Sequence, residues 1–191
     1  MTGFPLLDEI SAPDASLEAL ATTKKNFGMI PDVEKVMALA PQLLTGYAQM
    51  WDLFETTTLS HIERQVVYMT ANFENECNYC VPWHTLLAKK AGMAPGEIEA
   101  LRSGAPLSDP KLQALSQFVR VLIANRGKAS EADLRVLFDA GYTSQQALEV
   151  VLGLAIKLIS NYTNSIAGTP LDKEVERFRW EKPVIRERLA A

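Results

Sequence analysis

Most of the chain carries hydrophobic residues at intervals of three and four, the spacing that gathers them on one face of an α-helix. No segment joins two alternating hydrophobic–polar runs through a tight-turn sequence, so no β-hairpin is expected. The sequence therefore predicts an all-α fold, a compact helical bundle. The helices are expected over residues 16–27, 33–39, 41–54, 60–73, 80–90, 109–125, 130–141 and 143–162.

Three of these helices have recognisable starting signals. Ser60 and Glu63 have the spacing of a capping box, in which each side chain bonds the other residue's backbone N–H. Thr143 and Gln146 repeat the same spacing before the longest apolar segment. Ser130 precedes acidic residues, which are favourable at the positive end of a helix dipole. We expect a helix to begin at each of these points.

Size and composition fit one soluble domain. The chain has 191 residues, 48% of them hydrophobic and 22% charged, and no low-complexity linker divides it. We predict a single all-helical domain over residues 1–191, with a core of reactive residues at about 41–92 and a C-terminal helical half at about 109–180. The net charge of −4 and the lack of a basic block argue against a nucleic-acid partner.

The termini and apolar stretches indicate no membrane association. Residues 1–5 lack the basic and apolar regions of a signal peptide. The most apolar stretch, residues 150–159, is shorter than a bilayer span and contains Gly153 and Lys157. A cytoplasmic location is the expectation.

The chain's reactive residues are concentrated in one short segment. Its only two cysteines, Cys77 and Cys80, have C-x-x-C spacing, and His84 follows one helical turn after Cys80. In a reducing compartment such a pair favours redox or metal chemistry over a structural disulfide. Pro82 belongs in a first helical turn, so a helix should start near Cys80. The helix dipole would then favour the Cys80 thiolate.

Several roles remain open for this segment. His84 is placed to serve Cys80 as a base or as a cationic partner. Tyr79 and Trp83 flank the pair and either pack in the core or restrict access to it. Alternatively the cysteines are inert core residues, or they bind zinc with His84 and a fourth ligand. The fourth zinc ligand would come from Glu74, Glu76 or His61, although the position of His61 at a helix start is typical of a surface residue.

A faint internal repeat is also present. Residues 77–80 align with residues 160–163 at an offset of 83, each set following a capped apolar helix. This pattern suggests two related helical units, of which only the first retains thiols, but two identities are equally compatible with chance.

These residues resemble a known family, the AhpD-like alkyl hydroperoxidase group of the carboxymuconolactone decarboxylase family, in its peroxidase-related branch. The resemblance extends from about Phe27 to Asp172. It is carried by Phe27-Gly28-Met29-Ile30-Pro31-Asp32, Leu59-Ser60, Glu63-Arg64-Gln65-Val66-Val67, Cys77-Asn78-Tyr79-Cys80, His84, Asn161-Tyr162, Asn164, Ile166-Ala167 and Thr169-Pro170-Leu171-Asp172.

The resemblance implies an all-helical fold, assembly into symmetric homo-oligomers, and peroxide reduction without a bound cofactor or metal. If the roles in the family's C-x-x-C motif are carried over to this chain, Cys80 attacks the peroxide and Cys77 resolves the product as a disulfide. His84 would belong to a proton relay. A lipoyl-bearing protein or another external dithiol would be the reductant.

The sequence departs from the family pattern at two positions. The relay glutamate is replaced by Gln65, whose amide forms hydrogen bonds but cannot act as a base. Tyr79 stands where a histidine often precedes the second cysteine. Glu63 or Glu76 would be the substitute carboxylates, although Glu63 lies roughly 200° around a helix from Gln65.

The resulting hypothesis is a thiol peroxidase that reduces organic hydroperoxides. Two alternatives remain: a decarboxylase or isomerase acting on a small lactone, and a redox-sensing oligomer without efficient turnover. The pair of thiols argues against the first, because lactone chemistry has no need for both.

Overall fold

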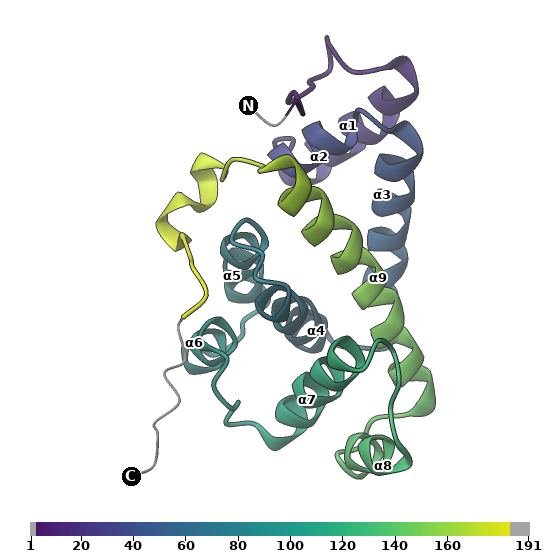
Figure 1. Ribbon diagram of the computed structural model, residues 1–191, viewed down its shortest axis with the longest axis vertical. Coiled ribbons are helices and arrows are strands. Elements are labelled where there is room, and N and C mark those ends of the chain that lie inside the picture. Colours follow the sequence, from purple (N-terminus) through teal and green to yellow (C-terminus); the bar gives the residue numbers. More distant parts are fainter. Residues whose placement is uncertain (1–2, 184–191) are drawn as a thin grey trace.

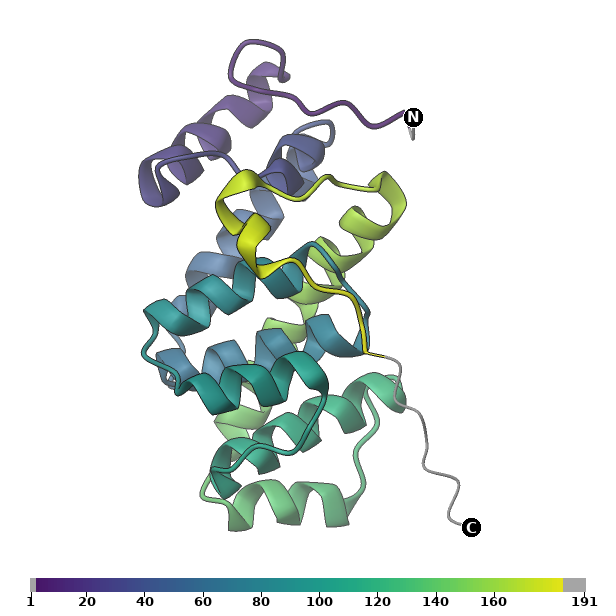
Figure 2. The same ribbon diagram turned by 90° about the vertical axis from the view of Figure 1, so that its left-hand side faces the viewer.

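The computed structural model describes residues 3–183, and all regular secondary structure in that range is helical. Figures 1 and 2 show an elongated bundle, with the N-terminal helices at one end and α8 at the other. The helices are α1 (Asp14–Phe27), α2 (Asp32–Met37), α3 (Pro41–Glu55), α4 (His61–Glu74), α5 (Cys80–Lys90), α6 (Pro95–Ser103), α7 (Pro110–Ala124), α8 (Glu131–Asp139), α9 (Ser144–Ala167) and the 3₁₀ helix η1 (Lys173–Phe178).

The predicted all-α fold is confirmed, and so are the three predicted starting signals. Ser60, Ser130 and Thr143 each cap a helix through a complete capping box. Helix α6 was not predicted. Its surroundings, with Gly92, Pro95 and Gly96 close together, resemble a loop, but Pro95 occupies the first helical turn, where proline is tolerated.

Helix α4 forms the centre of the bundle. It packs against α5, α7 and α9, and every residue from Glu63 to Phe73 is buried. A helix that is buried all round must satisfy its polar side chains internally. Those polar groups, among them Gln65 and Asn72, lie where they can contact neighbouring helices.

Helix α9 runs beside α3 and crosses α4 at close range (Figure 1). Gly153 permits this approach: a Cβ there would lie 2.7 Å from Cζ of Phe54 and 2.9 Å from Cγ1 of Val67. The helix is longer than the apolar stretch suggested, and by length and composition alone it could cross a membrane. Half of its most apolar window is buried inside the bundle.

The proposed internal repeat is not matched by the backbone. Residues 77–80 lie at the break between α4 and α5, whereas residues 160–163 lie inside the continuous helix α9. The two segments are nevertheless neighbours in space, because Asn161 contacts Cys80.

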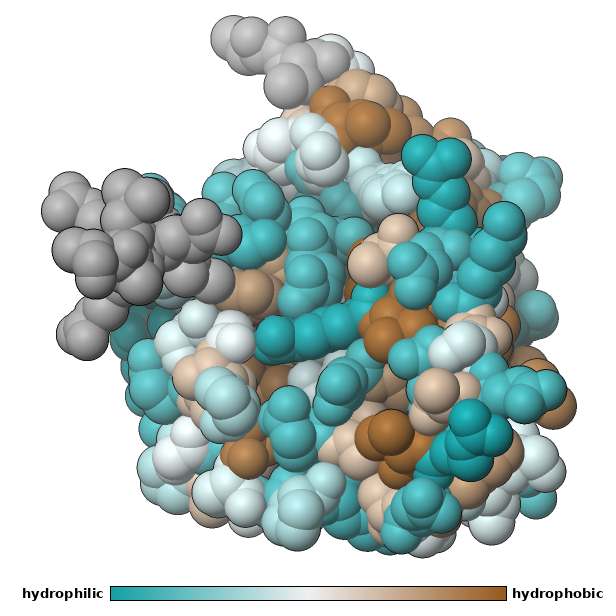
Figure 3. Space-filling model, turned by 60° about the horizontal axis from the view of Figure 1, so that its bottom comes forward, coloured by the Kyte–Doolittle hydropathy of each residue, from teal (hydrophilic) through white to brown (hydrophobic). Residues whose placement is uncertain are grey.

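The chain after α9 folds back over α5, where η1 packs (Figure 2). This return segment brings Asp172 to the start of α5, and it inserts Trp180 against Phe73 and Val81. The face at the α7–α8 end is mainly hydrophilic, with small separate hydrophobic patches (Figure 3).

Candidate active site

The two cysteines lie on either side of a tight turn between α4 and α5. The Cys77 N–H donates to the Asn72 carbonyl (2.9 Å) and the Glu76 N–H to the Phe73 carbonyl (3.1 Å), which together form a Schellman motif. Glu76 has a φ of 54°, in the left-handed region that this motif requires. Helix α5 begins at Cys80, as predicted, and the Cys80 N–H donates to the Cys77 sulfur (3.2 Å).

Helix α9 supplies hydrogen-bond donors to the Cys80 sulfur. The side-chain amides of Asn161 and Asn164 lie 3.1 and 3.2 Å from it. Asn161 is itself held by Asn72 and Asn75, each at 2.9 Å. A thiolate can only accept hydrogen bonds, so two fixed amide donors favour the ionised sulfur.

A chain of three buried side chains lies beside the dithiol. The Lys157 ammonium is 2.9 Å from Nε2 of His84, and Nδ1 of His84 is 2.9 Å from Oε1 of Gln65. Because the ammonium can only donate, Nε2 is the acceptor and Nδ1 carries the ring proton, which it donates to Gln65. His84 is therefore a neutral imidazole in a fixed tautomer.

The two sulfurs have opposite proton affinities. Burial opposes ionisation of Cys80. This effect is outweighed by the Cys77 hydrogen bond, the positive charge of Lys157 and the two asparagine amides, which together lower the Cys80 pKa to about 6. Burial and the neighbouring Cys80 raise the pKa of Cys77 well above its ordinary value. At neutral pH, Cys80 is thus a thiolate and Cys77 a thiol that donates to it.

The structure corrects one of the reasons given for this reactivity. Burial, with the charge of Lys157, lowers the pKa of His84 well below its ordinary value, so His84 is not the cationic partner of Cys80. That partner is Lys157: burial lowers the pKa of Lys157, and the two adjacent cysteines oppose that decrease. Cys80 is the first residue of α5, as expected from Pro82, and its own N–H donates to Cys77. The ionisation of Cys80 therefore depends chiefly on side chains, most of them from α9.

Tyr79 and Trp83 are fixed by a buried carboxylate. Asp172 accepts hydrogen bonds from the Tyr79 hydroxyl, from the Trp83 indole (2.8 Å) and from the Asp32 N–H (3.1 Å). The Tyr79 hydroxyl in turn accepts one from the Val33 N–H (3.1 Å). These bonds tie the cysteine turn to α2 and to the return segment.

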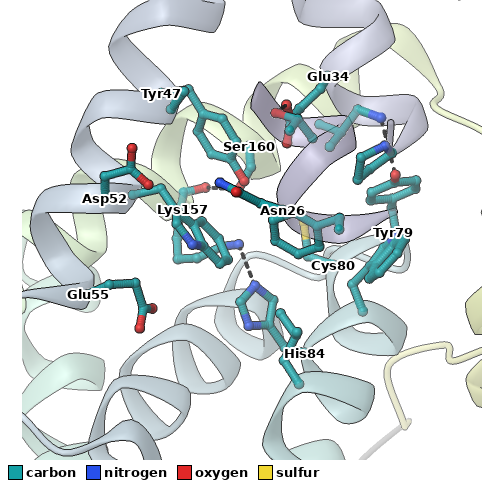
Figure 4. Close-up of a pocket in the computed structure, with 18 of the residues that line it drawn as sticks. Asn26, Glu34, Tyr47, Asp52, Glu55, Tyr79, Cys80, His84, Lys157 and Ser160 are labelled. Atoms are coloured by element: carbon teal, nitrogen blue, oxygen red, sulfur yellow. Dashed lines mark hydrogen bonds between the residues drawn. The ribbon is translucent and has the colours of Figure 1, made fainter. Parts of the chain in front are cut away.

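A cavity of about 250 Å³ lies in front of Cys80 (Figure 4). Its wall contains Cys80, His84 and Lys157 but not Cys77. Aromatic side chains make up much of the remaining wall, together with Glu34 from α2. These aromatic residues are Phe27, Tyr47, Trp51, Tyr79 and Trp83.

The other candidate ligands and carboxylates are directed elsewhere. Glu63 completes the capping box and pairs with Lys111 (3.0 Å), and Glu74 pairs with Arg120. Glu76 and His61 are exposed. Neither Glu63 nor Glu76 thus stands in for the family's relay glutamate. Over residues 3–183 no three His, Cys, Asp or Glu side chains gather where they could hold a metal ion.

Sequence reasoning missed several residues of this site. Lys157 was regarded only as an interruption of an apolar stretch, and Glu34 was given no role. Asn161 and Asn164 are part of the family resemblance, and Asn161 also of the internal repeat, without a function in either. One signal was available: Lys157, Asn161 and Asn164 recur at helical spacing on the same buried stripe as Val150. A lysine in such a stripe requires a partner in the core.

The comparisons with known proteins agree with this architecture. A sequence model of the carboxymuconolactone decarboxylase family matches residues 41–121, the part of the chain that contains the dithiol. A comparison with curated protein sequences finds no match.

Similar solved structures cover nearly the whole chain. A peroxidase-related protein with an AhpD core from Ralstonia eutropha has a TM-score of 0.80 at 20% identity, over 90% of this chain and 93% of that one. A peroxidase-related protein from Silicibacter sp. has a TM-score of 0.76 at 21% identity, over 91% and 92%. The debrominase Bmp8, as a cysteine-to-alanine variant with 2,3,4-tribromopyrrole, has a TM-score of 0.74 at 14% identity, over 91% and 93%.

Proposed function

We propose that this chain, which matches the carboxymuconolactone decarboxylase family model over residues 41–121 and shares its fold with AhpD-like proteins, is a thiol peroxidase that reduces organic hydroperoxides. One observation carries the proposal: of the two cysteines, only Cys80 faces the cavity, and it is the one whose pKa is lowered. A peroxide in the cavity would meet the thiolate directly, while Cys77 lies behind it.

The first step transfers two electrons from sulfur to the peroxide. The Cys80 thiolate attacks the terminal oxygen, an S–O bond forms, the O–O bond breaks, and an alkoxide leaves. Cys80 is then a sulfenic acid. In the second step Cys77 attacks the Cys80 sulfur, its thiol proton leaves with the hydroxide as water, and the Cys77–Cys80 disulfide forms.

The buried side chains around the dithiol have distinct roles in this cycle. Lys157, Asn161 and Asn164 stabilise the Cys80 thiolate before attack. His84 and Gln65 fix the position of Lys157: the imidazole lone pair accepts from the ammonium, and the Gln65 amide oxygen fixes the tautomer that offers this lone pair. They are positioning residues in this scheme, which differs from a carboxylate-driven relay.

The aromatic wall of the cavity favours an organic peroxide over hydrogen peroxide. Tyr47, Trp51 and Trp83 would surround the hydrocarbon part of the substrate while the peroxide group points to Cys80. The disulfide is returned to the dithiol by an external dithiol, and a lipoyl-bearing protein is the reductant that the family resemblance suggests. A homo-oligomer is proposed on the same basis.

The direct test is stopped-flow oxidation of the reduced protein by cumene hydroperoxide, followed by counting the free thiols. We expect rapid loss of two thiols per chain in the wild type. Cys80→Ser should abolish the rapid phase, whereas Cys77→Ser should keep it but lose only one thiol.

Oxidation of the wild type at the rate of a free thiol would contradict the proposal. A stable disulfide that forms slowly and changes the oligomeric state would instead favour the redox-sensing alternative.

A second function is favoured by one observation, the aromatic cavity directly beside Cys80 in a fold shared with a debrominase. The same dithiol could reduce a brominated aromatic ring: an aryl bromide, the Cys80 thiolate and the Cys77 thiol would give the arene, the disulfide and bromide. Bromide release from a bromopyrrole, measured beside peroxide consumption, separates the two reactions.

A further inference from the structure

The first step of the peroxidase cycle needs a proton that the groups beside Cys80 do not supply. The alkoxide leaves as a strong base unless it is protonated. The ring proton of His84 is held by Gln65, and its other nitrogen accepts from Lys157. Lys157 already donates to His84 and must carry its charge again when the Cys80 thiolate is regenerated, and the Cys77 proton is used in the second step.

Glu34 is a carboxyl group in the same cavity. It projects from α2 and is 7% exposed, and it lines the cavity together with Cys80. In Figure 4 its carboxyl group lies in the upper part of the cavity and the Lys157–His84 pair in the lower part. Its hydrogen-bond partner is the Thr23 hydroxyl, and within residues 3–183 no cationic side chain pairs with it.

Its surroundings keep Glu34 partly protonated near neutral pH, where an ordinary glutamate is ionised. Burial raises its pKa to about 7, and the Thr23 hydrogen bond opposes that rise. The Tyr47 hydroxyl belongs to the same cavity, and burial, followed by the charges of Glu34 and Cys80, raises its pKa. The titratable groups that face the cavity from α3, α5 and α9 are Tyr47, Asp52, Glu55, Tyr79, Cys80, His84 and Lys157, and α1 contributes none.

From this arrangement we propose that Glu34 is the general acid that protonates the alkoxide leaving from Cys80, an inference that rests on the proposed peroxidase function. In the balanced step, the Cys80 thiolate, the hydroperoxide and the Glu34 carboxylic acid give the sulfenic acid, the alcohol and the Glu34 carboxylate. Water then reprotonates Glu34. The carboxyl group absent at Gln65 is in effect supplied by α2, from the wall of the cavity.

A purely structural role for Glu34, joining α1 to α2 through Thr23, predicts different behaviour. Glu34→Gln keeps an oxygen that accepts from Thr23 but has no acidic proton. The test compares cumene hydroperoxide, whose alkoxide needs a proton, with peracetic acid, whose carboxylate leaves without one. We expect the ratio of the two oxidation rates to fall about 100-fold in Glu34→Gln. A structural defect would slow both peroxides alike and leave the ratio unchanged.

The pH profile gives a second readout. In the wild type the rate with cumene hydroperoxide should rise near pH 6, as Cys80 ionises, and fall above about pH 7, as Glu34 loses its proton. Glu34→Gln should lose the fall and keep the rise. Thr23→Val removes the bond that lowers the Glu34 pKa, so the fall should move to higher pH. Asp52→Asn, at an exposed carboxylate on the same cavity, is the control and should leave the ratio unchanged.

The outcomes separate this inference from the function on which it rests. If the wild type reacts with both peroxides no faster than a free thiol, the peroxidase function fails. If the wild type is fast while Glu34→Gln keeps the wild-type rate ratio and the fall above pH 7, the function stands and the role of Glu34 is refuted.

Discussion

Replacing Lys157 by methionine tests whether the buried ammonium ionises Cys80. Methionine has a similar length and no charge, so the variant retains most of the packing of α9. The loss of the ammonium leaves no buried charge unpaired, because Cys80 can take up a proton when its counter-charge is removed, so we expect the variant to fold. Thermal unfolding followed by circular dichroism checks this before any titration.

The expected size of the effect follows from the Cys80 pKa of about 6. A neighbouring opposite charge shifts a pKa by about 1 to 3 units, so without Lys157 the value should rise to between about 7 and 9. At pH 7 the thiolate fraction would fall from about nine-tenths to between about one-half and one-hundredth. Peroxide oxidation at that pH should slow by about 2- to 100-fold.

The assay is a titration of the thiolate by its ultraviolet absorbance, beside the oxidation rate at each pH. Because the pKa of Cys77 is raised, the first ionisation belongs to Cys80. Lys90→Met, which removes an exposed lysine at the end of α5, is the matched control and should titrate like the wild type. An unchanged Cys80 pKa in folded Lys157→Met would refute the assignment of Lys157 as the counter-charge.

Three further predictions concern other parts of the structure. Gln65→Glu places a carboxylate against the His84 N–H and should raise the His84 pKa, measured by NMR; an unchanged pKa would contradict the contact. Gly153→Ala should lower the melting temperature, because overpacking costs about 1–3 kcal/mol and exceeds the gain in helix propensity. At Gly46 an added Cβ meets nothing within 4 Å, so the control Gly46→Ala should raise the melting temperature, through a gain of about 1 kcal/mol in the free energy of unfolding. The pKa of Glu34 is about 7 in the folded protein against 4.5 when unfolded, so the wild type loses stability as the pH rises from 4.5 to 7. Gln has no such titration. In denaturant unfolding, the free energy of unfolding of Glu34→Gln minus that of the wild type should therefore be about 3 kcal/mol larger at pH 8 than at pH 4.

The helices were largely predictable because their signals are local. Capping boxes at Ser60 and Thr143 and the position of Pro82 depend on residues a few positions apart, and the structure confirms each of them. Helix α6 was missed because proline and glycine near its start are typical of a loop as well.

The candidate site was only partly predictable because its electrostatics are not local. Cys77, Cys80 and His84 lie within eight residues of sequence, but the charge that stabilises Cys80 comes from Lys157, and the buried acid is Glu34. Only tertiary packing brings α2 and α9 to the cavity. The local sequence therefore suggested His84 as the cationic partner of Cys80, a role that Lys157 has in the structure.

The proposed division of labour between the two cysteines is the central claim. It is tested most directly by treating reduced Cys77→Ser with cumene hydroperoxide in the presence of dimedone, a reagent that traps sulfenic acids, and locating the label by mass spectrometry. The account predicts a single label on Cys80, and in the wild type an internal Cys77–Cys80 disulfide in place of the label. Rapid oxidation that persists in Cys80→Ser and labels Cys77 would contradict it.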